Sequence, residues 1–241
     1  MKIINLLTLN NIEITNIATD PKYRHLVQRK IKLLSLASAI ADANISNYFI
    51  IENIDNDNNK AEQIRDFVKT LNQGWYEIKR IKSVTCVSKA GVFNEIMNLA
   101  EGETIAIREF FEIKYCGYAW ITKNHNTYIE VRKGGFFGFW TSGDIPTYYL
   151  IGPDGEVMTE YLSDTDGYYR YDYDKESWCW SQNESLSKEI VSLDKKYFLK
   201  INYILRKINN DRANMHLAWI ISGEELKVFD LYIPIGVGVI E

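Results

Sequence analysis

One acidic residue leads directly into a glycine-rich segment of the chain. Glu130 closes a strand-like run, and glycines follow it at positions 134, 135, 138 and 143. Glycine adopts backbone conformations closed to other residues and lets a ligand approach the main chain. A carboxylate beside such a loop could position a hydroxyl or an amine, or support a cation. The alternative is an ordinary hairpin with glycines at bulges, in which Glu130 forms a plain salt bridge with Arg132.

The elements that must position this loop are of both kinds. Apolar residues at helical spacing predict helices over residues 22–43, 61–71 and 186–209. Alternating or short apolar runs predict strands, among them residues 12–17, 48–52, 75–83, 127–131, 148–151, 157–161 and 167–173. A hairpin is expected at 217–221 and 226–230, around the turn SGEE. Because helices and strands are mixed without strict alternation, the α+β class is favoured over a doubly wound sheet.

Composition and charge exclude several classes of protein. The 241 residues carry a formal charge of −4, so we expect neither nucleic acid nor an acidic membrane as a partner. No run of 18 apolar residues is present, and the N-terminus lacks the features of a signal peptide. Three widely spaced cysteines indicate reduced thiols in a cytoplasmic protein. Three histidines without HxH or HExxH spacing argue against a histidine-built metal site.

A tyrosine-rich segment, residues 161–180, admits two interpretations. Tyr168, Tyr169, Tyr171 and Tyr173 alternate with polar residues and could form a platform for a sugar or peptide. Aromatic residues are also favoured in strands, where they form cross-strand pairs. A half-buried antiparallel strand is therefore the favoured interpretation.

Several short motifs occur in an order that points to one family. Gln28-Arg29-Lys30 precedes a leucine-rich helix, and Arg80 lies on WYEIKRI before Ala90-Gly91. Further along come Arg108-Glu109, Cys116-Gly117, and then Glu130, Gly134, Thr141-Ser142-Gly143 and Pro146. In order and spacing, residues 22–235 resemble the nucleotide-binding domain of the phosphoenolpyruvate synthase and pyruvate phosphate dikinase family, an ATP-grasp fold.

The resemblance implies an architecture and an activity. It implies an ATP-grasp-like α+β protein of two lobes, with mixed and antiparallel sheets and flanking helices. The N-terminal lobe would span residues 1–100, and the C-terminal lobe, 101–241, would hold the glycine-rich loop and the terminal hairpin. The nucleotide would be ATP, bound between the lobes with Mg²⁺. If active, the protein would be a phosphotransferase acting on a small-molecule acceptor.

The resemblance also assigns roles to residues. Phosphoryl transfer depends mostly on positioning and charge neutralisation, and Lys30 and Arg80 would be the catalytic cations that hold the phosphates. Arg108, Glu130 and Gly134 would lie at the nucleotide. Asp230 would be the metal ligand, since magnesium prefers oxygen ligands.

Departures from the family pattern leave two other functions open. Gln28-Arg29 replaces a Gly-Gly pair, Arg108 replaces a glutamine, and the final hairpin reads His216-Leu217-Ala218 where the family has Asp-x-Glu. A first alternative is a catalytically degenerate ATP-grasp subunit that binds or scaffolds a partner protein. A second, resting on the tyrosine and tryptophan content, is a carbohydrate-binding β-rich module.

Overall fold

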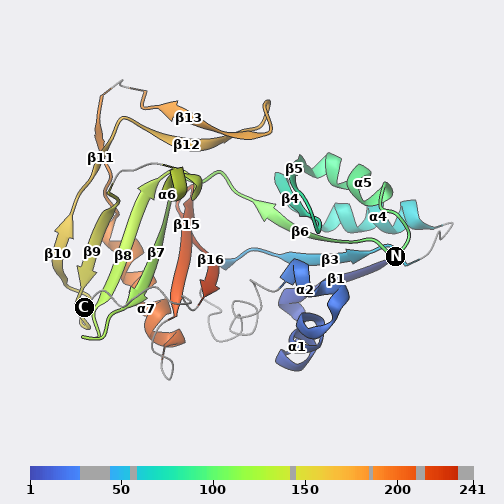
Figure 1. Cartoon of the computed structure of the whole chain (residues 1–241), viewed down its shortest axis with the longest axis horizontal. Helices are drawn as coiled ribbons and strands as arrows, with labels where there is room; N and C mark the ends of the chain where they lie inside the picture. The colour runs from blue at the N-terminus through green and yellow to red at the C-terminus, as the bar shows by residue number, and fades with distance from the viewer. Residues whose placement is uncertain (28–43, 55–58, 142–144, 185–186, 210–214, 233–241) are drawn as a thin grey trace. The chain divides into compact units, whose positions relative to one another are not determined.

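The chain divides into two compact units (Figure 1). The computed structural model describes residues 1–27, 44–54, 59–141, 145–184, 187–209 and 215–232. Unit 1 comprises residues 1–35 and 46–111, and unit 2 comprises residues 36–45 and 112–241. The expected division after residue 100 precedes the last strand of unit 1. Each unit combines a mainly antiparallel sheet with helices, which confirms the α+β class.

Unit 1 is built on a five-stranded antiparallel sheet. Its strands, in spatial order, are β1 (Lys2–Asn5), β3 (Tyr48–Glu52), β6 (Thr104–Phe110), β4 (Trp75–Lys79) and β5 (Val84–Ser88). The strand predicted at 48–52 is confirmed. The strand predicted at 75–83 ends at Lys79, because the main-chain N–H of Arg80 donates to the carbonyl of Ser83 at 2.8 Å and closes a turn.

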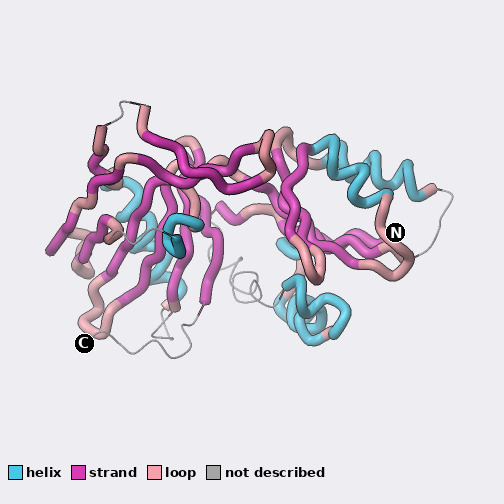
Figure 2. Tube along the Cα trace, turned by 45° about the horizontal axis from the view of Figure 1, so that its top comes forward, coloured by secondary structure: helices cyan, strands magenta, loops and turns pink. Residues whose placement is uncertain are grey.

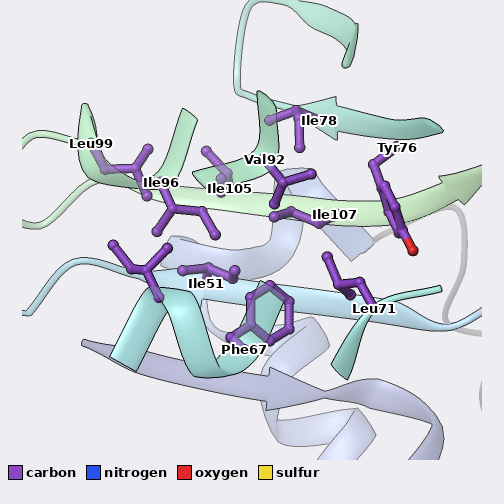
Figure 3. Packing of buried hydrophobic residues seen from close by; sticks show 11 residues of the cluster. Ile51, Phe67, Leu71, Tyr76, Ile78, Val92, Ile96, Leu99, Ile105 and Ile107 are labelled. Atoms are coloured by element: carbon purple, nitrogen blue, oxygen red, sulfur yellow. The ribbon is translucent and has the colours of Figure 1, made fainter. Parts of the chain in front are cut away.

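Helices cover both faces of this sheet. Because successive strand residues point to opposite faces, Ile105 and Ile107 face one side and Ala106 the other. Helices α4 (Lys60–Thr70) and α5 (Lys89–Met97) pack on the first side (Figure 3), where the core includes Ile51, Ile64, Phe67, Ile78, Val92, Ile96, Ile105 and Ile107. Helices α1 (Asn11–Thr19) and α2 (Pro21–Val27) pack on the second, with η1 (Leu6–Thr8).

The strand predicted at residues 12–17 is wrong, because these residues lie in α1. The side chain of Asn10 accepts from the main chain of Ile12 and Glu13, and Glu13 accepts from the main chain of Asn10. This capping box stabilises a helix start, and it outweighs the weak alternation that favours a strand.

Unit 2 is built on a seven-stranded sheet. Its strands, in spatial order, are β10 (Val157–Tyr161), β9 (Thr147–Ile151), β8 (Thr127–Lys133), β7 (Tyr115–Ile121), β15 (His216–Ser222), β16 (Glu225–Tyr232) and β2 (Asn44–Ile45). Among these described strands, only β2 runs parallel to its neighbour. The predicted terminal hairpin is confirmed as β15 and β16.

Helix α7 (Lys195–Ile208) covers one face of this sheet (Figure 1). It buries Phe198 against Tyr149, with ring centroids 5.4 Å apart, and Thr127 donates to Asn202 at 2.5 Å. The helix expected from residue 186 begins at Lys195, because Asp194 caps its N-terminus by accepting from the main chain of Lys196.

Smaller elements complete unit 2 (Figure 2). They are the short helix α6 (Phe137–Thr141), the pair β11 (Asp164–Thr165) and β14 (Glu189–Ile190), and the hairpin of β12 (Gly167–Asp172) and β13 (Ser177–Gln182). None of the described helices has the length and hydropathy needed to span a membrane.

Candidate functional site

The predicted site residues fall on both units. Arg80 and Arg108 belong to unit 1, and Glu130, Gly134 and Asp230 belong to unit 2. Lys30 lies outside the described residues. The described candidates therefore form two separate sets, one in each unit.

Arg80 lines a pocket in unit 1 with a volume of about 480 Å³. Three short segments form its walls: the start of α2 with Lys22 and His25, the turn at residues 80–83, and residues 102–104 at the start of β6. Lys22 is thus brought close to Arg80 and Lys82, which lie about 60 residues further along the chain.

Local contacts hold two walls of this pocket in place. The side chain of Asn53 donates to the carbonyl of Leu99 at 2.8 Å, and Lys60 reaches the same carbonyl and that of Met97 at the end of α5. These bonds fix the loop that leads into Thr104. On the α2 side, Glu52 accepts from both Lys22 and Tyr23.

The Glu52 cluster is an ionic anchor for α2. Burial raises the pKa of Glu52, but the hydrogen bonds from Lys22 and Tyr23 outweigh it, so the pKa lies below its usual value. Burial and the bond to Glu52 also raise the pKa of Tyr23. The carboxylate is thus ionised and tied to α2 at neutral pH.

Most of the cationic charge in the pocket is already balanced. Arg80 pairs with Glu95 at 2.6 Å and Glu103 at 3.4 Å, while Lys22 pairs with Glu52. Lys82 is exposed and makes no ion pair with any residue in the described ranges. An incoming anion would therefore meet Lys82 first and would compete with carboxylates for Arg80.

Two polar side chains on the pocket wall have no hydrogen-bonding partner in the described part of the chain. They are the Nε2 atom of His25 and the hydroxyl of Thr104, and both atoms are buried. Burial, together with the charge of Lys79, lowers the pKa of His25 below its usual value. The imidazole is therefore neutral at neutral pH. An unpartnered buried polar atom is costly, and native structures contain few of them.

Arg108 lies on β6, away from the residues that line this pocket. It pairs with Glu77 on the neighbouring strand at 2.6 Å, and both side chains are 16% exposed. This pair joins β4 to β6.

In unit 2 the glycine-rich segment packs against the β12–β13 hairpin. Gly134 has a φ of +78°, and a side chain there would overlap the carbonyl of Tyr169. A side chain at Gly135 would overlap the ring of Trp178. The main-chain N–H of Gly135 donates to Tyr169 at 2.9 Å. These two glycines therefore admit the β12–β13 hairpin.

Glu130 lies on β8 opposite Tyr148 of β9, on the sheet face away from α7. It is half-buried, and its carboxylate makes no ion pair with Arg132 or with any other described residue. Burial raises the pKa of Glu130, and the charge of Arg132 only partly opposes this. Burial, Glu130 and Tyr148 together raise the pKa of Tyr128 to about 12.

Replacing Glu130 with glutamine should stabilise the protein at neutral pH. A carboxyl whose folded pKa is raised favours folding only while it is protonated, so its ionised form lowers the free energy of unfolding. We expect Glu130→Gln to raise that free energy by about 0.5 kcal/mol at pH 7, and the gain to vanish near pH 4. Urea denaturation at both pH values measures the difference. The exposed Glu160→Gln on β10 is the control, and an equal gain there would contradict the prediction.

The described residues do not fit a magnesium site. Asp230 lies on β16, three strands from Glu130 on β8, which separates them by about 14 Å at normal strand spacing. The carboxylate of Asp230 also accepts from the main chain of Leu231 at 2.9 Å. Within the described ranges, no three histidine, cysteine or acidic residues gather in a way that could hold a metal.

Aromatic side chains in unit 2 pack mainly on one another. A five-ring ladder crosses β10, β9, β8, β7 and β15 and consists of Tyr161, Tyr148, Tyr128, Trp120 and His216. Successive ring centroids lie 4.3–5.6 Å apart, and successive ring planes are within 36° of each other. The ring faces are thus turned to neighbouring rings. The tyrosine-rich segment forms the predicted antiparallel strand, in which Tyr169 contacts Trp180 and Tyr171 contacts Trp178.

Sequence reasoning missed His25 and Thr104 as site residues and considered Lys82 only as a replacement for Arg80. No motif contains His25 or Thr104, because their segments come together only through the packing of α2 and the loop before β6. Residues 80–83, Arg-Ile-Lys-Ser, contain no glycine, proline, asparagine or aspartate and fall within the strand predicted at 75–83, so no sequence signal pointed to a pocket.

Comparisons with known proteins return structures and no sequence matches. No protein-family model matches the chain, and no curated protein is similar to it in sequence. Among solved structures, D-alanine-D-alanine ligase from Helicobacter pylori is similar with a TM-score of 0.42 and 9% identity, over 85% of this chain and 53% of the ligase. Phosphoribosylglycinamide synthetase from Anaerococcus prevotii has a TM-score of 0.41 and 15% identity, over 89% and 45% of the two chains.

A third structure is the ATP-grasp ligase PsnB, with a TM-score of 0.40 and 7% identity, over 91% of this chain and 56% of the ligase. The chain spans about half the length of these proteins. It is thus similar to ATP-grasp ligases, and at TM-scores below 0.5 this likeness carries no argument about chemistry. The chain's own residues must therefore carry any conclusion about function.

Proposed function

We propose that this chain is an ATP-grasp-like protein that binds a nucleotide through the unit 1 pocket. The observation that carries the proposal is the gathering of Arg80, Lys82 and Lys22 around one pocket of about 480 Å³. That volume lies in the range of small-molecule sites. Phosphate oxygens pair well with arginine and lysine, and Lys82 is exposed for a first contact.

A more specific proposal is that the protein transfers a phosphate from ATP to a small acceptor. That reaction would use a magnesium ion, and the described residues do not assemble the ligands for one. The proposal is therefore limited to nucleotide binding. An activity like that of phosphoenolpyruvate synthase is also more specific than nucleotide binding, and the ligases found by comparison do not support it. A cytoplasmic location also belongs to the proposal and is supported by three cysteines without a disulfide.

A catalytically degenerate binding or scaffolding subunit is the second candidate. The pairing of Arg80 with two glutamates favours it, because this arginine then joins α5 to the start of β6. In this role the protein would bind a nucleotide or a partner protein without turnover.

Calorimetry and thermal shift with ATP, with and without Mg²⁺, test the proposal. ATP at a hundredfold excess over its Kd should raise the free energy of unfolding by about 2.7 kcal/mol. Lys82→Ala should weaken ATP binding about tenfold, the loss expected for one charged hydrogen bond. Lys123→Ala removes an exposed lysine from a turn of unit 2 and is the matched control.

Two outcomes would overturn nucleotide binding at this pocket. One is the absence of stabilisation by ATP or pyrophosphate, with or without the metal. The other is an equal loss of affinity in Lys82→Ala and Lys123→Ala, since a general charge effect does not depend on position. Binding without ATP hydrolysis or transfer to added acceptors would favour the scaffolding role.

A further inference from the structure

Two parts of the unit 1 pocket suit different ligand groups. The neutral wall consists of Thr104 and His25, and the cationic rim consists of Lys82 and Arg80. Thr104 is 7% exposed, and its hydroxyl has no hydrogen-bonding partner among the described residues. It lies at the start of β6, opposite Glu52 of β3, on the sheet face that α2 covers. The pairing with β3 sets the position of its main chain, and its side chain is buried.

His25 supplies the second unpartnered atom on this wall. It belongs to α2, and its Nε2 is buried beside the same pocket. Because burial and the charge of Lys79 lower the pKa of His25, the imidazole that lines the pocket is neutral at neutral pH. A neutral imidazole nitrogen and a threonine hydroxyl each bond a hydroxyl group of a ligand well. Neither supplies the charge that would select a bare anion.

The pocket therefore combines two chemistries in one space. Lys82 and Arg80 on the rim suit a phosphate, and Thr104 and His25 on the wall suit hydroxyl groups. Glu52, Glu95 and Glu103 largely neutralise the cations. Charge alone would therefore bind a bare phosphate only weakly. A ligand that carries both a phosphate and hydroxyl groups satisfies both parts.

We infer that the unit 1 pocket binds a phosphorylated sugar, with sugar hydroxyls on Thr104 and His25 and the phosphate on Lys82 and Arg80. This inference rests on the proposed function and names the part of the ligand that the pocket recognises. The sugar phosphate could be free or part of a nucleotide, and the experiment distinguishes these sources.

The test compares Thr104→Val with the wild-type chain. Valine keeps the shape of threonine and removes the hydroxyl. The probes are ribose 5-phosphate, AMP and inorganic pyrophosphate, each titrated by calorimetry. We expect Thr104→Val to weaken ribose 5-phosphate about tenfold, as for one buried hydrogen bond, and to change pyrophosphate affinity less than about twofold. Thr104→Ser, which keeps the hydroxyl, should stay within about threefold of wild type.

A second readout separates ligand recognition from a structural role. Thr104→Val removes a buried hydroxyl without a partner, so the ligand-free protein should melt at a higher temperature while sugar phosphate binds more weakly. A hydroxyl that only supports the fold would give a lower melting temperature. Thr85→Val, at an exposed position of β5, is the matched control and should change neither quantity.

Each outcome decides the inference. It is overturned if ribose 5-phosphate binds no more tightly than pyrophosphate, or if Thr104→Val leaves both affinities unchanged. If pyrophosphate binds through Lys82 and ribose 5-phosphate binds no more tightly, this inference is wrong and the proposed function is still supported. If neither these probes nor ATP binds, both the inference and the proposed function fail. A tenfold loss for AMP as well as ribose 5-phosphate would identify the ligand as a nucleotide, and a loss for ribose 5-phosphate alone would identify a free sugar phosphate.

Discussion

Replacing Ile107 with alanine should lower the free energy of unfolding of unit 1 by about 4 kcal/mol, near the upper part of the range for isoleucine truncation in a core. Ile107 is fully buried on β6, the central strand of the five-stranded sheet. Figure 3 shows it between the strands and the side chains of α4 and α5. Because β6 is hydrogen-bonded on both sides, to β3 and β4, the backbone cannot move in to fill the cavity.

Urea denaturation followed by circular dichroism measures this loss. Ile81→Ala is the control, because Ile81 is the same residue type in the same unit and is 72% exposed. We expect it to change stability by less than about 0.5 kcal/mol. A loss below about 1 kcal/mol for Ile107→Ala would mean that the core can collapse around the site, and would contradict the rigid placement of β6.

Replacing Gly117 with alanine should cost unit 2 about 3 kcal/mol, the upper end for overpacking in a core. Gly117 lies on β7, between β8 and β15. An added Cβ would overlap the main-chain oxygen of Glu130 and would lie 2.5 Å from the ring of Trp219. The main-chain oxygen belongs to the paired strand and cannot swing aside as a flexible side chain can. The strand pair itself must therefore shift.

The melting temperature of each variant measures this effect, with Gly138→Ala as the control. At Gly138 an added Cβ would come no closer than 3.8 Å to its nearest neighbour, a ring carbon of Tyr169. This variant should be close to neutral. Adding Trp219→Phe to Gly117→Ala should not restore stability, because the overlap with Glu130 remains. Full recovery would show that the indole alone occupies the space.

Strands with a clear apolar pattern could be predicted from the sequence. The helix at residues 12–17 could not, because a local capping interaction determines it. The apolar run at 48–52 and the SGEE turn predict β3 and the β15–β16 hairpin, because burial and turn chemistry agree there. At residues 12–17 a weak alternation competes with the capping box of Asn10 and Glu13, and the cap decides the outcome. Element type is thus predictable where several local signals agree.

The candidate site was less predictable for a related reason. The glycines at 134 and 135 show that something approaches the backbone, but only the fold reveals that Tyr169 and Trp178 do so. Arg80 was identified through a resemblance, while its partners Glu95 and Glu103 depend on the packing of α5. The sequence cannot indicate that the hydroxyl of Thr104 lacks a hydrogen-bonding partner, because this depends on which groups surround it in the folded protein.

The aromatic ladder of unit 2 carries information about strand order. Side chains on a strand alternate between the two faces of a sheet, so a shift of one residue in any of these strands would turn its ring from the ladder toward the α7 side. Each ring thus marks the correct neighbour and the correct register for the next strand. The five rings of the ladder therefore favour, for strands distant in sequence such as β7 and β15, one register out of several that main-chain hydrogen bonds alone would accept.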